Sequence, residues 1–191
     1  MSPAVIGPVP EGRDPEAYDR QRRRVLWSLP SGLYVIGSRG HLDGAERWNL
    51  MTANQVVQVS TSPKLVAVGV DADALTCALV RDGGVFAVSF VDRDDRALVR
   101  RFVKAVPVTD VVLAADGRPE RLAAEPVIVA ATGAPILTAA PAWIDCAVRH
   151  EVALGSHVLF VGEVLDVGGR ADDADTPPVL RMEDTRMNYG G

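Results

Sequence analysis

The chain has few of the side chains that disulfides, metal sites and nucleic-acid binding require. Its two cysteines, Cys77 and Cys146, form neither a C-x-x-C pair nor a metal-binding spacing, so we expect buried free thiols in a reducing cytoplasm. The three histidines show no zinc-protease spacing, since no histidine stands at position 154 after His150 and Glu151, and we predict no metal site. Acidic residues outnumber basic ones by 25 to 20, and a net charge of −5 argues against nucleic acid as a partner.

The sequence also lacks a secretory signal and an uninterrupted membrane span. Residues 1–16 have no charged start followed by a long apolar run, and their prolines and glycines predict a flexible arm over residues 1–13 before one domain over residues 14–191. The charge-free run 126–144 has the length of a membrane span, but residues that break helices stand along it: Pro126, Gly133, Pro135 and Pro141. We read this run as strand, turn and strand, and we expect a cytoplasmic protein without a membrane partner.

Familiar catalytic and nucleotide-binding motifs are missing as well. No G-x-G-x-x-G follows a strand pattern, no G-x-x-x-x-G-K-[ST] occurs, and no Ser–His–Asp set stands out. A dinucleotide, if one is used, is therefore not held in the usual glycine-rich cradle. An enzyme without catalytic groups of its own usually depends on the chemistry of a cofactor.

Strand patterns dominate what is present. Alternation, apolar runs and turn residues predict strands over 32–40, 49–60, 64–71, 85–91, 142–154 and 157–168, with a loop over 41–48 and short strands within 106–141. Helices are predicted over 15–29, 72–84 and 92–105. In the first of them Asp14 is the expected cap, and an apolar stripe is expected from Tyr18, Val25, Leu26 and Leu29. So many strands with so few helices indicate an antiparallel barrel or sandwich with helical decoration.

The segment 49–60, NLMTANQVVQVS, has an unusual polar face. Thr52, Asn54, Gln58 and Ser60 alternate with mostly apolar residues, and all four are uncharged hydrogen-bonding side chains. Such a face, beside the small Ala53, suits a flat heteroaromatic ligand with an amide-like edge, such as the isoalloxazine ring of a flavin. A polar face at a dimer interface, or one that is simply solvated, is the alternative, and the residues alone leave the choice open.

Residues 49–71, NLMTANQVVQVSTSPKLVAVGVD, resemble the signature of the flavin reductase-like, FMN-binding split-barrel family. Three further pieces agree with that family in the same order. They are YVIGSRG at 34–40, LTCALVRDGGVFAVSFVDRDDRALVRRFVK at 75–104 and GSHVLFVGEV at 155–164. The resemblance extends over nearly the whole folded chain.

The resemblance implies a mainly β fold, a six-stranded antiparallel split β-barrel with a few short helices, which works as a homodimer with flavin at or near the subunit interface. It implies an oxidoreductase that binds FMN, or alternatively FAD, and transfers hydride from NADH or NADPH to the flavin. Many such proteins are reductase components of two-component monooxygenases, so the resemblance allows a flavin-dependent oxygenase as partner. An FMN-binding electron-transfer or flavin-carrier module without reductase activity is the alternative function.

The resemblance also implies site residues. Carried over position by position, it assigns cofactor binding to Met51, Thr52, Ala53, Asn54, Ser60, Val70, Asp71, Thr76, Arg101, Phe102 and Lys104. It assigns the catalytic contact with the nicotinamide or flavin to His157. Arg186 and Tyr189 either cover the flavin of the partner subunit or belong to a free tail.

Two positions depart from the pattern of the family. Asp71 stands where relatives often have Asn, and it is expected either on the ring or ribityl side of the flavin or as the cap of a helix at 73–82. Ser156 replaces the usual Asp before His157, so the orientation of the histidine by a carboxylate is in doubt.

Overall fold

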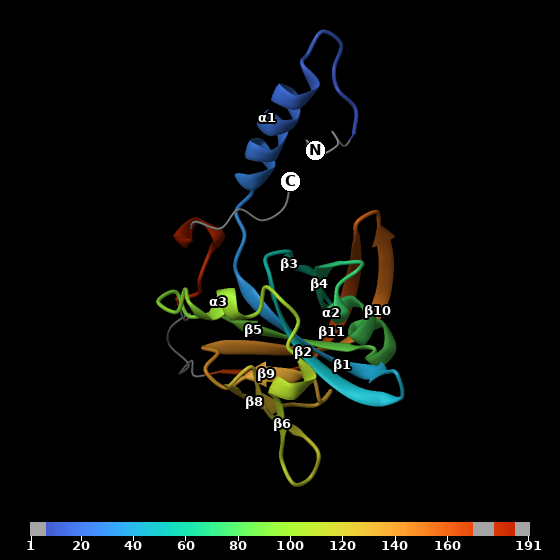
Figure 1. Cartoon of the computed structure of the whole chain (residues 1–191), viewed down its shortest axis with the longest axis vertical. Helices are drawn as coiled ribbons and strands as arrows, with labels where there is room; N and C mark the ends of the chain where they lie inside the picture. The colour runs from blue at the N-terminus through green and yellow to red at the C-terminus, as the bar shows by residue number, and fades with distance from the viewer. Residues whose placement is uncertain (1–6, 170–177, 186–191) are drawn as a thin grey trace.

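A computed structural model describes residues 7–169 and 178–185 of the chain, which fold into two antiparallel sheets with helices at the periphery (Figure 1). The seven strands of the larger sheet are β1 (Tyr34–Leu42), β2 (Ala45–Ala53), β3 (Val56–Thr61), β4 (Lys64–Asp71), β5 (Val85–Phe90), β10 (Ala142–Leu154) and β11 (His157–Gly169). The smaller sheet holds β6 (Val111–Leu113), β7 (Pro119–Leu122), β8 (Glu125–Val129) and β9 (Pro135–Leu137). The α-helices are α1 (Pro15–Trp27), α2 (Leu75–Gly83) and α3 (Leu98–Arg101), and 3₁₀ turns lie at Val108–Asp110 and Met182–Asp184.

The larger sheet curls into a split barrel. Its strand order is β2-β1-β5-β10-β11-β4-β3, so β2 and β3 form its two edges. Only Asn54 and Gln55 separate these two strands along the chain, so the sheet has to bend until its edges approach each other. Gln55 ties the junction to β4, because its carbonyl accepts a hydrogen bond from the amide of Gly69 at 2.9 Å. The split-barrel prediction is thereby confirmed.

The sheet has seven strands where six were expected, because the segment 49–60 divides. Its first half continues β2, which pairs with β1, whereas its second half forms β3, which pairs with β4. The change of partner at Asn54 and Gln55 places the two halves on opposite edges of the sheet. The expected loop over 41–48 is also shorter, since Asp43 and Gly44, both with positive φ, make a two-residue hairpin turn.

Two large apolar clusters and a small third one, around Ala87 and Ile136, fill the interior. One lies inside the curl of the large sheet and includes the fully buried Phe86 and Phe160. The other joins the β2 side of the barrel to the small sheet, and it includes Leu50, Phe102 and Leu122. Burial of each such side chain stabilises the fold by about 1.5–3 kcal/mol. The second cluster matters for the site, because it anchors the segment that follows α3.

The helices match the predictions unevenly. The cap of α1 is confirmed, since Asp14 Oδ1 accepts a hydrogen bond from the amide of Ala17 at 2.8 Å. The end of α2 is also confirmed, with Gly84 in the left-handed conformation as its C-cap. The helix predicted over 92–105 is wrong for most of its length, because α3 has four residues. Before α3 the carboxylate of Asp92 accepts from the amide of Asp94 in a turn that competes with helix formation, whereas the carboxylate of Asp95 accepts from the amide of Leu98, where α3 begins.

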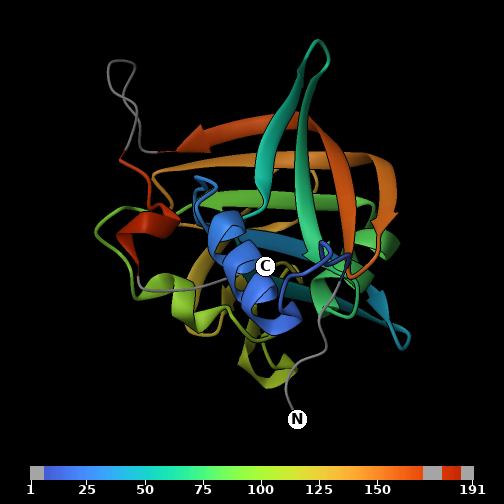
Figure 2. The ribbon, with the colours of Figure 1, turned by 90° about the horizontal axis from the view of Figure 1, so that it is seen from above.

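Helix α1 projects from the barrel and does not lie along either sheet (Figures 1 and 2). Three residues of the expected apolar stripe face solvent in this structure: Val25, Leu26 and Leu29 are 62%, 47% and 67% exposed. The one buried residue of α1 is Asp19, whose carboxylate is paired with the guanidinium groups of Arg22 and Arg23. None of the helices in residues 7–169 and 178–185 is long and apolar enough to cross a membrane.

Candidate functional site

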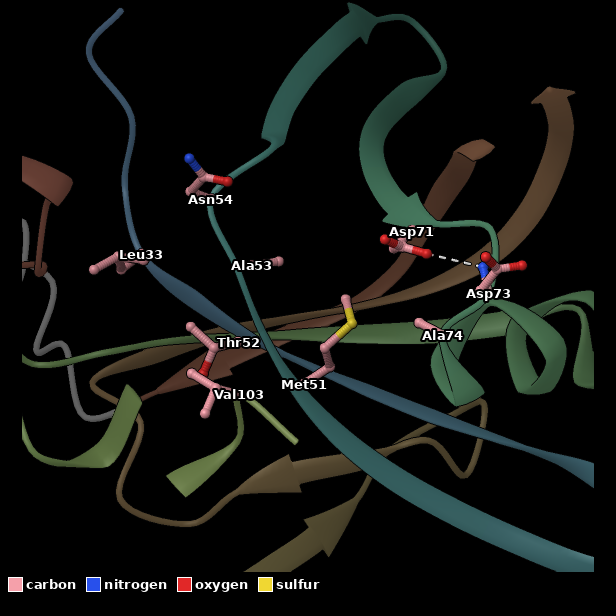
Figure 3. Close-up of a pocket in the computed structure, with 9 residues that line it drawn as sticks. All are labelled: Leu33, Met51, Thr52, Ala53, Asn54, Asp71, Asp73, Ala74 and Val103. Carbon is pink, nitrogen blue, oxygen red and sulfur yellow. Dashed lines mark hydrogen bonds between the residues drawn. The ribbon is translucent and has the colours of Figure 1, made fainter. Parts of the chain in front are cut away.

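A pocket of about 290 Å³ opens where β2 and β4 end and α2 begins (Figure 3). It is lined by Leu33, Met51, Thr52, Ala53, Asn54, Asp71, Asp73, Ala74 and Val103. Four separate segments of the chain form the lining of the pocket. They are the residue before β1, the end of β2 with Asn54, the β4–α2 junction, and the residue that follows Phe102. The lining combines apolar side chains with a few polar ones, as in small-molecule sites generally.

Asn54 is a half-buried polar residue of the pocket whose side chain makes only a weak hydrogen bond to the described protein. Its Nδ2 lies 3.5 Å from Ser31 Oγ, which is at the limit of a hydrogen bond. Its Oδ1 is buried and has no hydrogen-bond partner among the described residues. A buried acceptor left unpaired costs about 1–3 kcal/mol, so this oxygen is suited to a ligand that brings an N–H donor.

Thr52 is committed to the protein rather than free for a ligand. Its amide donates to the carbonyl of Phe102 at 2.9 Å, and its Oγ1 donates to the carbonyl of Val99 at 2.6 Å. A hydroxyl has one proton to donate, and here that proton is used. Only lone pairs of Thr52 Oγ1 can therefore face the pocket.

Asp71 and Asp73 make one side of the pocket acidic. Asp71 Oδ1 accepts a hydrogen bond from the amide of Asp73 at 2.9 Å, and the carbonyl of Asp71 accepts from the amide of Ala74 at 3.1 Å. The cap position of α2 is Ala74, and no side chain bonds to the helix start there. Asp71 therefore holds the turn before α2 and is not its cap. Two exposed carboxylates at this rim repel a phosphate group.

His157 lies beside this acidic rim. It begins β11 and is paired with Asp71 in the ladder between β11 and β4, so the two side chains leave the same face of the sheet. Its Nδ1 is 3.0 Å from Ser156 Oγ, so a hydroxyl occupies the place where the family pattern has a carboxylate. His157 is not among the residues that line the pocket, and its catalytic role stays a prediction.

The structure brings together five of the expected cofactor-binding residues: Met51, Thr52, Ala53, Asn54 and Asp71. Ser60 lies elsewhere, because it pairs with Leu65 near the tip of the β3–β4 hairpin. From Leu65 to Asp71 the strand rises about 20 Å at about 3.3 Å per residue. Val70 and Phe102 are buried in the two cores, and the carbonyl of Phe102 reaches the site only by accepting from Thr52.

The remaining expected residues are also outside the pocket. Thr76 is buried, and its Oγ1 accepts a hydrogen bond from Asn49 Nδ2 at 2.9 Å. The guanidinium of Arg101 is paired with the carboxylate of Glu125. Lys104 is exposed and follows Val103. Arg186 and Tyr189 lie outside the described residues.

Sequence reasoning missed four of the pocket residues: Leu33, Asp73, Ala74 and Val103. The helix predicted over 72–84 was a signal for Asp73 and Ala74, because they stand at its expected start and connect β4 to α2. Leu33 and Val103 gave no local signal, since only the tertiary fold brings them to β2. Elsewhere in the described ranges, no group of three or more His, Cys, Asp or Glu side chains is placed to hold a metal ion.

Comparisons with known proteins agree on one family. Residues 26–190 match the family model described as flavin reductase like domain. The chain is 33% identical over 168 residues to the NADH-dependent FAD reductase of Streptomyces globisporus, which covers 86% of this chain and 83% of that protein. Residues that align with the solved flavin reductase PheA2 in its native state are 31% identical, with a TM-score of 0.60, over 79% of this chain and 87% of that chain.

A further solved structure is informative because it carries ligands. It is the NADH:FAD oxidoreductase SgcE6 of Streptomyces globisporus C-1027 in complex with NAD and FAD fragments. It is 28% identical to this chain with a TM-score of 0.58, over 84% of this chain and 87% of that chain.

Proposed function

The chain belongs to the flavin reductase like domain family, and on that premise we propose that it is an NADH-dependent flavin reductase. Its flavin is FMN or FAD. When bound, the flavin supplies the redox chemistry: it accepts a hydride from NADH together with one proton from solvent, and NAD⁺ is the other product. The names of the relatives support this reaction, since they describe NADH as the donor and FAD as the acceptor.

The observation that carries the proposal is a pocket with apolar surfaces on one side and an acidic rim on the other, bordered by Asn54, whose buried Oδ1 has no hydrogen-bond partner among the described residues. An isoalloxazine ring has two flat apolar faces and a pyrimidine edge with an N–H between two carbonyls. The apolar surfaces of Met51, Ala53 and Ala74 would suit the ring faces, and Asn54 Oδ1 would be the acceptor for the ring N–H. The residues present therefore fit the group.

The charges of the pocket indicate which part of the flavin enters it. Asp71 and Asp73 repel phosphate, so we propose that the neutral ring occupies the pocket and that the phosphate-bearing tail points away from the β4–α2 junction. In this arrangement the protein binds and orients the ring and excludes water from one of its faces. His157, on the same sheet face as Asp71, is proposed to stabilise negative charge on the ring as it is reduced.

A homodimer is also part of the proposal. The C-terminal end of α1 and the residues after it expose Val25, Leu26 and Leu29 to solvent, and a partner subunit could cover these apolar side chains. Light scattering coupled to size-exclusion chromatography measures the mass directly, and a monomer would contradict this part. An oxygenase that consumes the reduced flavin follows from the family resemblance alone and stays a prediction.

The test compares two amide side chains of the same stretch. Asn54→Leu removes the unpaired acceptor, whereas Gln58→Leu changes an exposed amide on β3 that bonds to the carbonyl of Ser60. Flavin-dependent NADH oxidation under anaerobic conditions is expected from the wild type and from Gln58→Leu. We expect a flavin KM at least about tenfold higher for Asn54→Leu, since about 1.4 kcal/mol of binding corresponds to a factor of ten.

Three results are separable in this assay. Flavin bound by the wild type but not reduced by NADH would favour the carrier function. No flavin bound at all would remove the proposal. A normal flavin KM in Asn54→Leu would remove Asn54 from the site.

A further inference from the structure

The free edge of β2 is covered by the segment 99–106 and not by another strand. The amide of Thr52 donates to the carbonyl of Phe102 at 2.9 Å, and Thr52 Oγ1 donates to the carbonyl of Val99 at 2.6 Å. Further back along the strand, Asn49 Oδ1 accepts from the amide of Val106 at 2.8 Å. These bonds satisfy edge groups of β2 that would otherwise be unpaired.

Two of these bonds also complete the C-terminus of α3. The last carbonyls of a helix have no partner inside the helix, and α3 ends at Arg101 with Phe102 as its C-cap. The carbonyls of Val99 and Phe102 are therefore groups that need an outside donor. Thr52 supplies both donors, one from its backbone and one from its side chain.

The capped segment delivers Val103 to the pocket. Val103 follows Phe102 directly, and it lines the pocket although its side chain is 58% exposed. Figure 3 shows Thr52 and Val103 together on the side of the pocket opposite Asp71 and Asp73. Since an exposed side chain has little packing to hold it, the position of Val103 depends on the backbone that carries it.

We propose that Thr52 is a positioning residue, which caps α3 so that Val103 forms the wall against which the flavin ring binds. The inference rests on the proposed function and deepens it, because it gives Thr52 a role other than direct donation to the ring. The hydroxyl proton of Thr52 is bound by Val99, so the contribution of this side chain to flavin binding passes through the segment 99–106.

The first test compares three threonine variants by flavin KM and kcat. Thr52→Val keeps the shape and removes the donor, and it is expected to raise the flavin KM by about tenfold while kcat at saturating flavin changes less than about twofold. Thr52→Ser keeps the donor and is expected to stay within about twofold of wild type. Thr61→Val makes the same chemical change at an exposed position at the end of β3 and is expected to alter neither. Thr52→Ser behaving like Thr52→Val would overturn the proposal.

The second test asks whether Thr52 acts through Val103. Val103→Ala alone is expected to raise the flavin KM by about threefold, because it removes apolar contact. In the Thr52→Val background, Val103→Ala is expected to raise the flavin KM by less than a further factor of about 1.5, since Val103 is already displaced there. Independent effects that multiply would mean that Thr52 contacts the flavin directly, and the proposal would fail.

A third measurement needs no flavin and separates this proposal from the proposed function. Hydrogen–deuterium exchange of the segment 99–106 is expected to become at least about tenfold faster in Thr52→Val, while the β10–β11 hairpin is unchanged. Unchanged exchange at 99–106 would overturn the positioning role even if flavin is bound. Faster exchange in a protein that binds no flavin would support the contact between Thr52 and the segment 99–106 but would contradict the proposed flavin reductase function.

Discussion

Two asparagines five positions apart in the chain are expected to respond in opposite ways to the same substitution. Asn49 is 2% exposed, and its side chain donates to Thr76 Oγ1 and accepts from the amide of Val106. Asn49→Leu leaves the backbone amide of Val106 unpaired, which costs about 1–3 kcal/mol, and it also removes the bond to Thr76. We therefore expect the free energy of unfolding to fall by about 3 kcal/mol. Asn54→Leu removes an acceptor that has no partner, so the free energy of unfolding should stay the same or rise.

Thermal unfolding followed by circular dichroism, without added flavin, measures the contrast. For 191 residues the entropy of unfolding is about 0.4 kcal/mol/K at about 2.1 cal/mol/K per residue. A loss of about 3 kcal/mol therefore lowers Tm by about 8 °C for Asn49→Leu. Asn54→Leu should melt within about 2 °C of wild type or above it. If Asn54→Leu melts as low as Asn49→Leu, Asn54 is held by the protein and the argument for a ligand at its Oδ1 is refuted.

Three further outcomes are expected. His157→Ala should slow anaerobic reduction of bound flavin by NADH at least about tenfold while the flavin Kd changes less than about threefold, and equal rates in variant and wild type would remove His157 from the mechanism. Burial raises the pKa of Asp145, which accepts two hydrogen bonds from Thr132, above 3.8. A carboxyl whose pKa is raised in the folded state stabilises the fold most at low pH. The free energy of unfolding of Asp145→Asn, measured with urea, should therefore rise relative to that of the wild type as the pH rises from about 3.8. The same pH dependence in both proteins would contradict this. Burial raises the pKa of Cys146 to about 12, so a thiol reagent at pH 8 should label it only after denaturation, and rapid labelling of the folded protein would contradict its burial.

Asn54 shows how function and stability conflict at this site. Because its buried acceptor has no hydrogen-bond partner within residues 7–169 and 178–185, Asn54 lowers the free energy of unfolding that the protein alone can reach. A bound donor removes that cost, so flavin should stabilise the fold as well as enter the reaction. The expected gain in stability of Asn54→Leu and its expected loss of flavin affinity have the same physical origin.

Local signals were sufficient for several elements. Asp14 before Pro15 marked the start of α1, and Gly84 marked the end of α2, because capping depends on neighbours in the chain. The turn at Gly155 and Ser156 and the run 64–71 were also found at the expected residues. The resemblance to the flavin reductase family, read from the stretch 49–71, is confirmed by the family match over residues 26–190.

Other features depended on contacts that no local pattern carries. An apolar stripe normally indicates a buried helix face, whereas Val25 and Leu29 of the stripe predicted over 15–29 face solvent. Arg101 was expected to bind the cofactor, but its guanidinium pairs with the carboxylate of Glu125, 24 positions further along the chain. Long-range partners of this kind compete with every role that sequence alone suggests.

By itself the sequence determined the family, the strand-rich class and the ends of most elements, because these follow from short-range periodicity, capping and turn chemistry. Tertiary structure alone decided that the segment 49–60 changes partners at Asn54, that Thr52 is bound by Val99, and that Leu33 and Val103 complete the pocket. The reason is physical. A hydrogen bond or a pocket wall depends on which distant residues the folded sheet brings within reach, and that is set by the curl of the barrel as a whole.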